Sequence, residues 1–184
     1  MFVEFKEKTF ESYFVDELSR KNGFFYCPDQ TDEFHLGFDS MFYLSRRYYS
    51  SYWQRLNIGN WLKGVTPQEV EDMGRQFNKI YPGIKANLFF QFKRPEFLKK
   101  KTAKEWKYWQ SDYFRFSLYQ HQHDTLTKLS RCCSNKAKVL YAAPRLATTA
   151  ELINAAQSKK VIDNTQIIEV SNLAGHKKYT YSIS

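Results

Sequence analysis

Three polar residues in two apolar, strand-like stretches have types and spacing suited to phosphodiester chemistry. Asp39 lies in EFHLGFDSMFY, and Gln91 and Lys93 end the run LFFQFK. Because strand side chains alternate with a period of two, we expect Gln91 and Lys93 to share one face. A carboxylate with a second oxygen ligand suits Mg²⁺, and a neighbouring lysine can orient the attacking water or stabilise charge on the phosphate. An acidic residue in the first helix would complete this set.

The elements that must position these residues form an α/β pattern with a small mixed sheet. Apolar residues spaced by four predict a helix over Glu7–Lys21, with Phe10, Phe14 and Leu18 on its buried stripe. Strands are predicted over 24–27, 33–43, 88–93, 137–143 and 165–170, and further helices over 111–133 and 148–158.

A different composition marks residues 44–86, which are rich in Arg, Tyr and Trp and include the capping box Thr66-Pro-Gln-Glu. About 43 residues is short for an independent core. We therefore expect residues 1–184 to form a single domain that carries a helical insertion at about 44–86.

The order of these features resembles the PD-(D/E)XK nuclease superfamily, which has the restriction-endonuclease-like fold. The match consists of a glutamate in the first helix, Gly-Phe-x-Tyr at 23–26, Gly-Phe-Asp at 37–39 and a strand that ends in Gln-x-Lys. It covers about 7–93, the next helix and the strand VLYAAP, but not the insertion. The resemblance implies a Mg²⁺-dependent endonuclease in which Mn²⁺ can substitute.

The resemblance also implies roles for individual residues. Asp39 matches the metal-binding aspartate, and Lys93 matches the catalytic lysine. Gln91 stands at the (D/E) position, where this branch of the superfamily has an amide. Glu11 is the best match for the helix glutamate, and the carbonyl group of Phe92 would complete the metal ligands.

Alternatives remain open at several of these positions. Glu17 is a second choice for the helix carboxylate, and Glu33 could supplement Asp39. In the resembled fold the helix after Gln-x-Lys packs behind the site, so Gln122, Arg115 or Tyr113 could line its edge. Since a neutral amide binds metal less strongly than a carboxylate, the alternative function is a catalytically inactive module on the same fold that binds nucleic acid or a protein.

The charge favours a nucleic-acid partner, and the resemblance implies DNA in preference to RNA. The chain has 28 Lys and Arg, 19 Asp and Glu and a net charge of +9. The run KRPEFLKKKTAKEWK adjoins the aromatic residues Trp106, Tyr108 and Trp109 and predicts a phosphate-binding surface, although a solvated loop would have the same composition. The expected nucleic-acid-binding residues are Arg94, Lys99, Lys100, Lys101 and Lys104, with Arg46, Arg47 and Arg55 in the insertion. The Tyr and Trp residues of the insertion could instead contact a protein partner or a second copy of the chain.

Other classes of protein are disfavoured. No apolar run approaches the roughly 20 residues of a membrane span, and the start MFVEFKEKTFE lacks the apolar segment of a signal peptide. Three cysteines form neither a disulfide framework nor a CxxC metal motif, so we expect a cytoplasmic protein. His121 and His123 are two residues apart on a predicted helix and so should face different sides. By analogy with stand-alone members of the resembled fold, a role in prokaryotic or phage defence or in DNA processing is expected.

Overall fold

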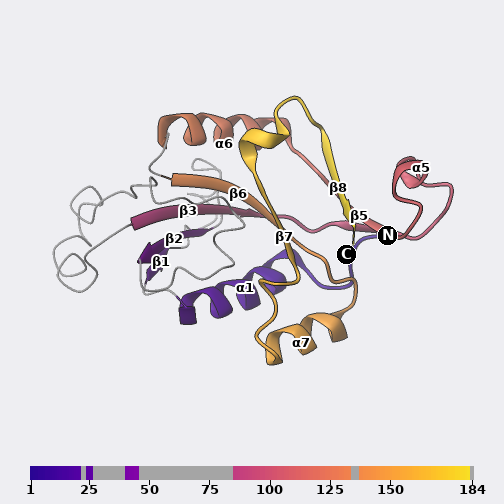
Figure 1. Ribbon diagram of the computed structural model, residues 1–184, viewed down its shortest axis with the longest axis horizontal. Coiled ribbons are helices and arrows are strands. Elements are labelled where there is room, and N and C mark those ends of the chain that lie inside the picture. The colour runs from indigo at the N-terminus through magenta and orange to yellow at the C-terminus, as the bar shows by residue number, and fades with distance from the viewer. Residues whose placement is uncertain (22–23, 27–39, 46–84, 134–136, 183–184) are drawn as a thin grey trace. The chain divides into compact units, whose positions relative to one another are not determined.

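The computed structural model describes residues 1–21, 24–26, 40–45, 85–133 and 137–182 (Figure 1). The described chain is mixed α/β. It divides into two compact units, of which unit 1 comprises Met1–Leu18, Phe92–Asp124 and Tyr141–Ser184, and unit 2 comprises Ser19–Gln91 and Thr125–Leu140. Asp39, Glu33, Arg46, Arg47 and Arg55 lie outside the described residues, as does most of the expected insertion.

The described elements begin with a helix, and four strands follow it before the next helix. They are α1 (Glu7–Lys21), β1 (Phe24–Tyr26), β2 (Ser40–Ser45), β3 (Lys85–Phe92), β4 (Glu96–Leu98), α5 (Trp106–Trp109), β5 (Tyr113–Ser117), α6 (Gln120–Cys133), β6 (Ala137–Pro144), α7 (Thr149–Gln157), β7 (Thr165–Glu169), the 3₁₀-helix η3 (Val170–Leu173) and β8 (Lys178–Ser182).

Helix α1 has the predicted bounds and buries the predicted stripe. Phe10, Phe14 and Leu18 are 0 % exposed. The ring of Phe92, the last residue of β3, lies against Phe10 and Phe14 with centroids 5.8 and 5.2 Å apart. Such edge-on aromatic pairs add to the burial energy of the rings. The stripe of α1 therefore fixes the end of β3, directly before Lys93.

In unit 2, strands β1, β2 and β3 form an antiparallel meander. The register pairs Phe25 with Phe42, and it pairs Ser40, the first residue of β2, with Phe90. The first half of β6 follows β3 in the strand order. Of the strand predicted over 33–43, only 40–43 falls within the described residues, and β2 covers that part.

Unit 1 contains a three-stranded antiparallel sheet with the order β4-β5-β8. The ring of Phe114, on the central strand β5, stacks on Phe97 at 4.7 Å and on Tyr181 at 5.4 Å. In the same unit, β7 is the neighbour of the second half of β6.

The helix predicted over 111–133 is wrong in its first part, because residues 113–117 form β5. Aromatic residues favour strands, and β5 is the central strand of its sheet, so pairing on both sides outweighs any helical tendency. The helix α6 begins only at Gln120. Of the helices in the described part of the chain, none is both long and apolar enough to cross a membrane.

Candidate functional site

The side chain of Lys93 is buried among polar and aromatic groups at the end of β3. It is 6 % exposed, and its ammonium group donates a hydrogen bond to the side-chain oxygen of Gln122. The same nitrogen lies 5.3 Å from the ring centroid of Tyr119 and 5.6 Å from that of Tyr141. Aromatic faces attract a cation most strongly where water is excluded. We call these four residues the lysine cage.

The parts of β6 and α6 that belong to unit 1 hold the lysine cage in place. The backbone N–H of Lys93 donates to the carbonyl oxygen of Ala142 at 2.9 Å, which ties the lysine to β6 beside Tyr141. Gln122 comes from the first turn of α6, and Tyr119 directly precedes that helix. Gln122, one of the three residues that could line the edge of the expected site, thus contacts Lys93.

His123 supports the cage from behind Tyr141. It is 4 % exposed, its ring stacks on that of Tyr141 at 6.1 Å, and its Nδ1 lies 3.2 Å from the tyrosine hydroxyl. Burial is the largest influence on the pKa of His123 and lowers it below its ordinary value. Asp124 opposes this lowering of the pKa, whereas the positive charges of His176 and Lys93 add to it. His121 is exposed, so the two histidines do differ in their surroundings, as their spacing predicts.

Burial also raises the pKa of the Tyr141 hydroxyl well above its usual range. Tyr141 therefore stays protonated at neutral pH and can donate a hydrogen bond to the neutral imidazole of His123. At neutral pH the charge of the lysine cage is therefore that of the Lys93 ammonium group.

Two of the expected metal ligands are buried in different units. Glu11, in unit 1, is 7 % exposed, and its carboxylate pairs with the ammonium group of Lys8 at 3.1 Å. Gln91, in unit 2, is 3 % exposed. Within the described ranges, no three His, Cys, Asp or Glu side chains gather closely enough to hold a metal ion.

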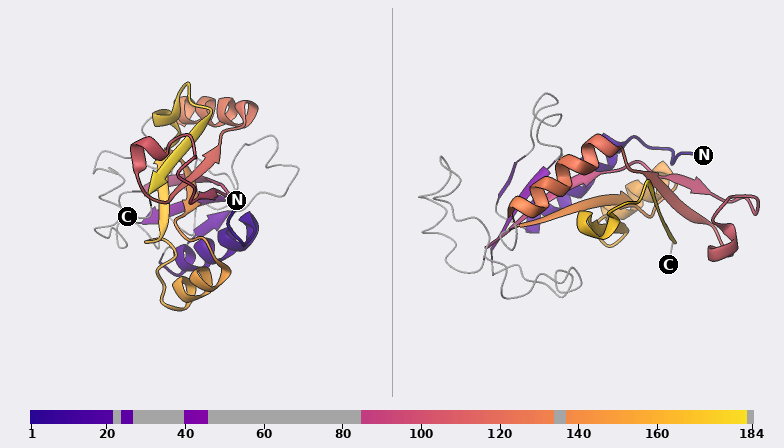
Figure 2. Two further views of the ribbon diagram at one scale, coloured as in Figure 1. Left: turned by 90° about the vertical axis from the view of Figure 1, so that its right-hand side faces the viewer. Right: turned by 90° about the horizontal axis from the view of Figure 1, so that it is seen from above.

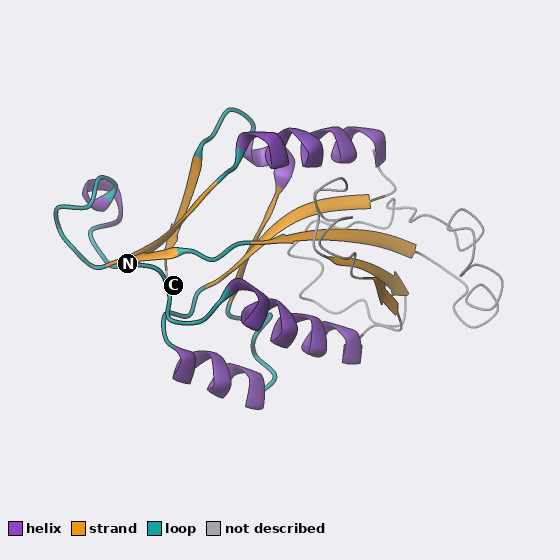
Figure 3. Ribbon diagram, turned by 180° about the vertical axis from the view of Figure 1, so that it is seen from behind, coloured by secondary structure: helices purple, strands orange, loops and turns teal. Residues whose placement is uncertain are grey.

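Glu17, the second choice for the helix carboxylate, has a structural role. Its Oε2 accepts hydrogen bonds from the backbone N–H groups of Val161 at 2.7 Å and Ile162 at 3.3 Å. These contacts attach α1 to the segment between α7 and β7, and the two helices lie next to each other in Figure 3. Glu17 is therefore a structural link between α1 and this segment.

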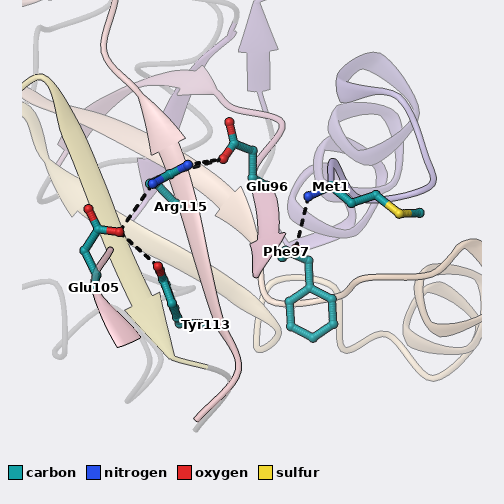
Figure 4. Close-up of polar contacts among 6 residues, drawn as sticks. All are labelled: Met1, Glu96, Phe97, Glu105, Tyr113 and Arg115. Atoms are coloured by element: carbon teal, nitrogen blue, oxygen red, sulfur yellow. Dashed lines mark hydrogen bonds and ion pairs between the residues drawn. The ribbon is translucent and has the colours of Figure 1, made fainter. Parts of the chain in front are cut away.

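Arg115 and Tyr113, the other residues expected at the edge of the site, lie on β5 rather than on a helix. Arg115 binds the carboxylate of Glu96 at 2.6 Å and that of Glu105 at 3.3 Å. The hydroxyl of Tyr113 donates to Glu105 at 2.9 Å (Figure 4). These contacts hold the connection between β4 and β5 together.

The expected nucleic-acid-binding residues of unit 1 differ in exposure. Arg94 is half-buried: its guanidinium donates to the carbonyl oxygen of Val3 at 2.6 Å and lies 5.3 Å from the ring of Phe2. Its backbone N–H donates to the Glu7 carboxylate at 2.8 Å. The lysines are all exposed on the connection between β4 and β5: Lys99, Lys100, Lys101 and Lys104.

Sequence reasoning missed the two tyrosines of the lysine cage. Tyr119 and Gln122 are three residues apart, a spacing that places both on one side of a helical turn. That spacing is the only sequence signal for Tyr119. Tyr141 could not be found in this way, because the pairing of β6 with the end of β3 brings together residues far apart in the chain.

Comparisons with known protein families, with curated proteins and with solved structures find no match for this chain.

Proposed function

We propose that this protein is a metal-dependent endonuclease that hydrolyses phosphodiester bonds in DNA, on a restriction-endonuclease-like core. The observation that carries the proposal is the buried, caged ammonium group of Lys93. Burying a lysine is costly unless its charge is compensated, and buried titratable groups of this kind concentrate at functional sites. The cage keeps the ammonium group in a fixed position directly after the end of β3.

The pairing of β2 with β3 supports the same function. Ser40 follows Asp39 in the sequence and pairs with Phe90, the residue before Gln91. The start of β2 and the end of β3 therefore meet within unit 2. This is the arrangement that a site built on Asp39 and the Gln-x-Lys motif requires.

In this mechanism Lys93 acts on the developing negative charge of the phosphate. A preorganised cation in a site with little water stabilises such charge without having to reorganise during the reaction. The amide oxygen of Gln122 fixes the direction of the ammonium group. The rings of Tyr119 and Tyr141 limit the access of water to it.

The proposed ligands are oxygen donors, which suit a hard cation such as Mg²⁺, with Mn²⁺ as a substitute. Glu11 offers a buried carboxylate and Gln91 a buried amide oxygen. With Asp39 and the carbonyl group of Phe92, they are the residues that would hold the ion. When bound, the metal would polarise the phosphate and lower the pKa of a coordinated water.

The test is cleavage of labelled DNA by the purified chain in Mg²⁺ or Mn²⁺, with EDTA as the blank. We expect Lys93→Met to lower the cleavage rate by about 10²-fold or more, because it removes a charge while keeping an aliphatic stem. Asp39→Ala should do the same. DNA binding in EDTA, measured by fluorescence anisotropy, should change little in either variant.

Lys160→Met is the matched control, since Lys160 is an exposed lysine outside the cage. It should cleave like the wild type, and circular dichroism should show that all the variants are folded. A wild-type chain that binds DNA but cuts it with neither metal would overturn the proposal. That result would leave the catalytically inactive nucleic-acid-binding module as the function.

The cellular setting belongs to the same proposal. We place the enzyme in the cytoplasm, in prokaryotic or phage defence or in DNA processing. In the described part of the chain, Cys132 and Cys133 are free thiols, which is compatible with a reducing compartment.

A further inference from the structure

The connection between β4 and β5, residues 99–112, forms an exposed basic surface that we call the lysine hairpin. It contains five lysines and two acidic residues. All five lysines, at 99, 100, 101, 104 and 107, are exposed. In both Figure 1 and Figure 2, the connection and its short helix α5 extend away from the paired strands.

One of the two acidic residues, Glu105, forms an ion pair with Arg115 of the protein itself. Burial would raise the pKa of Glu105, but the hydrogen bond from Tyr113 and the charge of Arg115 outweigh it, and the pKa lies below its ordinary value. Glu105 is therefore ionised at neutral pH and paired with Arg115 (Figure 4). Within the described part of the chain, no carboxylate lies at ion-pair distance from Lys100, Lys101 or Lys107.

Two aromatic residues of the lysine hairpin, Trp109 and Tyr108, differ in their surroundings. Trp109 stacks on Tyr113 at 6.4 Å and donates from Nε1 to the hydroxyl of Thr180 at 3.3 Å, so it holds the hairpin to its own sheet. Tyr108 is 74 % exposed, and the ammonium group of Lys107 lies 4.8 Å from its ring centroid. One face of a large aromatic ring is thus presented to solvent among positive charges.

We propose that the lysine hairpin binds single-stranded nucleic acid, with Tyr108 stacked on an unpaired base and the lysines on the flanking phosphates. A ring that reaches out from a basic surface can stack only on a base whose face is open, which a duplex hides. A membrane surface fits less well, because α5 has only four residues and so cannot form an amphipathic membrane-binding helix. This inference deepens the proposed nuclease function, on which its biological meaning rests, by naming unpaired strands as the substrate class.

The experiment measures binding in EDTA, where no metal-dependent cleavage takes place. The probes are a fluorescein-labelled oligo(dT) of about 15 nucleotides, within the usual site sizes for single strands, and a duplex of equal length. We expect tighter binding of the single strand. Tyr108→Ala should weaken it by about 5-fold or more, and Tyr108→Phe, which keeps the stacking face, should bind like the wild type.

The lysines are tested through the salt dependence of binding. Each phosphate contact to a single strand contributes about 0.7 to the slope of log affinity against log salt. The variant Lys100→Ala/Lys101→Ala/Lys104→Ala should therefore lower that slope by about 2. The control Lys160→Ala/Lys177→Ala removes two exposed lysines outside the hairpin and should leave the slope unchanged.

Three results would overturn this inference: equal affinity for single strand and duplex, an unchanged affinity in Tyr108→Ala, or equal competition by polyglutamate or anionic lipid vesicles. Its failure is distinguishable from failure of the nuclease proposal, because the binding assay contains no metal. Single-strand binding that depends on Tyr108, without any cleavage, would sustain the hairpin and overturn only the nuclease. Cleavage at an unchanged rate in Tyr108→Ala would support the nuclease proposal and overturn the role of the lysine hairpin.

Discussion

At the scale of single residues, unit 1 buries several ionisable groups, and each is given a specific partner. Lys93 has an amide oxygen and two aromatic rings, Glu17 has two backbone N–H groups, and His123 has a tyrosine hydroxyl. The partners differ because the roles differ. Glu17 and His123 hold elements together, whereas in the function we propose the cage around Lys93 fixes a charge for chemistry.

His123 should make stability depend on pH. Its pKa is lowered in the folded state, so below about pH 6.5 the unfolded chain binds more protons and the free energy of unfolding falls. One such group contributes a slope of at most about 1.4 kcal/mol per pH unit. Urea unfolding of His123→Phe between about pH 7.5 and about pH 5 should lack this component.

The control for this pH dependence is His121→Gln, which changes an exposed histidine two residues away. It should keep the wild-type slope. If His123→Phe shows the same dependence on pH as the wild type, the acid-linked loss of stability comes from another group.

Glu17 should matter for stability and not for metal binding. Glu17→Ala leaves the N–H groups of Val161 and Ile162 buried without their acceptor, and we expect a loss of about 1–3 kcal/mol in the free energy of unfolding. Denaturant titration measures this loss, with Asp163→Asn, an exposed change in the same segment, as the near-neutral control. An unfolding free energy equal to that of the wild type would contradict the assigned role.

At the scale of elements, local signals set the helices α1 and α7 well. The N-cap of α7 is a complete capping box: the hydroxyl of Thr148 accepts from the N–H of Glu151 at 3.2 Å, and the Glu151 carboxylate accepts from that of Thr148 at 3.0 Å. Burial would raise the pKa of Glu151, but these and a further bond from Ala147 lower it. The helix thus begins where the sequence predicts.

Removing that cap should destabilise the protein by a measurable amount. Thr148→Ala should cost about 1 kcal/mol of unfolding free energy, because the first turn of α7 loses a hydrogen-bond acceptor. Thr149→Ala is the matched control, since the hydroxyl of Thr149 has no part in the cap while its N–H still donates to Glu4 at 2.9 Å. Thermal or urea unfolding of the two variants measures the difference in their free energies of unfolding. Equal losses in both variants would show that the side chain of Thr148 is not the cap.

Strands were harder to predict than helices. β3, β6 and β7 have runs of apolar or β-branched residues, and the sequence locates them to within three residues at each end. β4, with three residues, and β8, with five, carry no such run, and neither was predicted. They exist because β5 pairs with both of them, and pairing partners distant in sequence cannot be inferred from local patterns.

At the scale of the whole molecule, charge separates along the chain. Residues 1–40 carry a net charge of −5 and the remainder +14. The first part contains the proposed metal carboxylates Asp39 and Glu11, and the second contains Lys93 and the lysine hairpin. A nuclease needs both signs, because anionic groups hold the cation and cationic groups hold the phosphates.

By itself the sequence determined what depends on near neighbours: the mixed α/β class, the bounds and buried stripe of α1, the bounds of α7 to within one residue and the candidacy of Gln91 and Lys93. The tertiary structure decided what depends on distant segments. It placed Tyr141 beside Lys93, attached Glu17 to a loop more than a hundred residues away and made residues 113–117 a strand. The physical reason is that helix caps and amphipathic stripes are specified within a few residues, whereas a lysine cage and a central strand exist only after separate parts of the chain have packed.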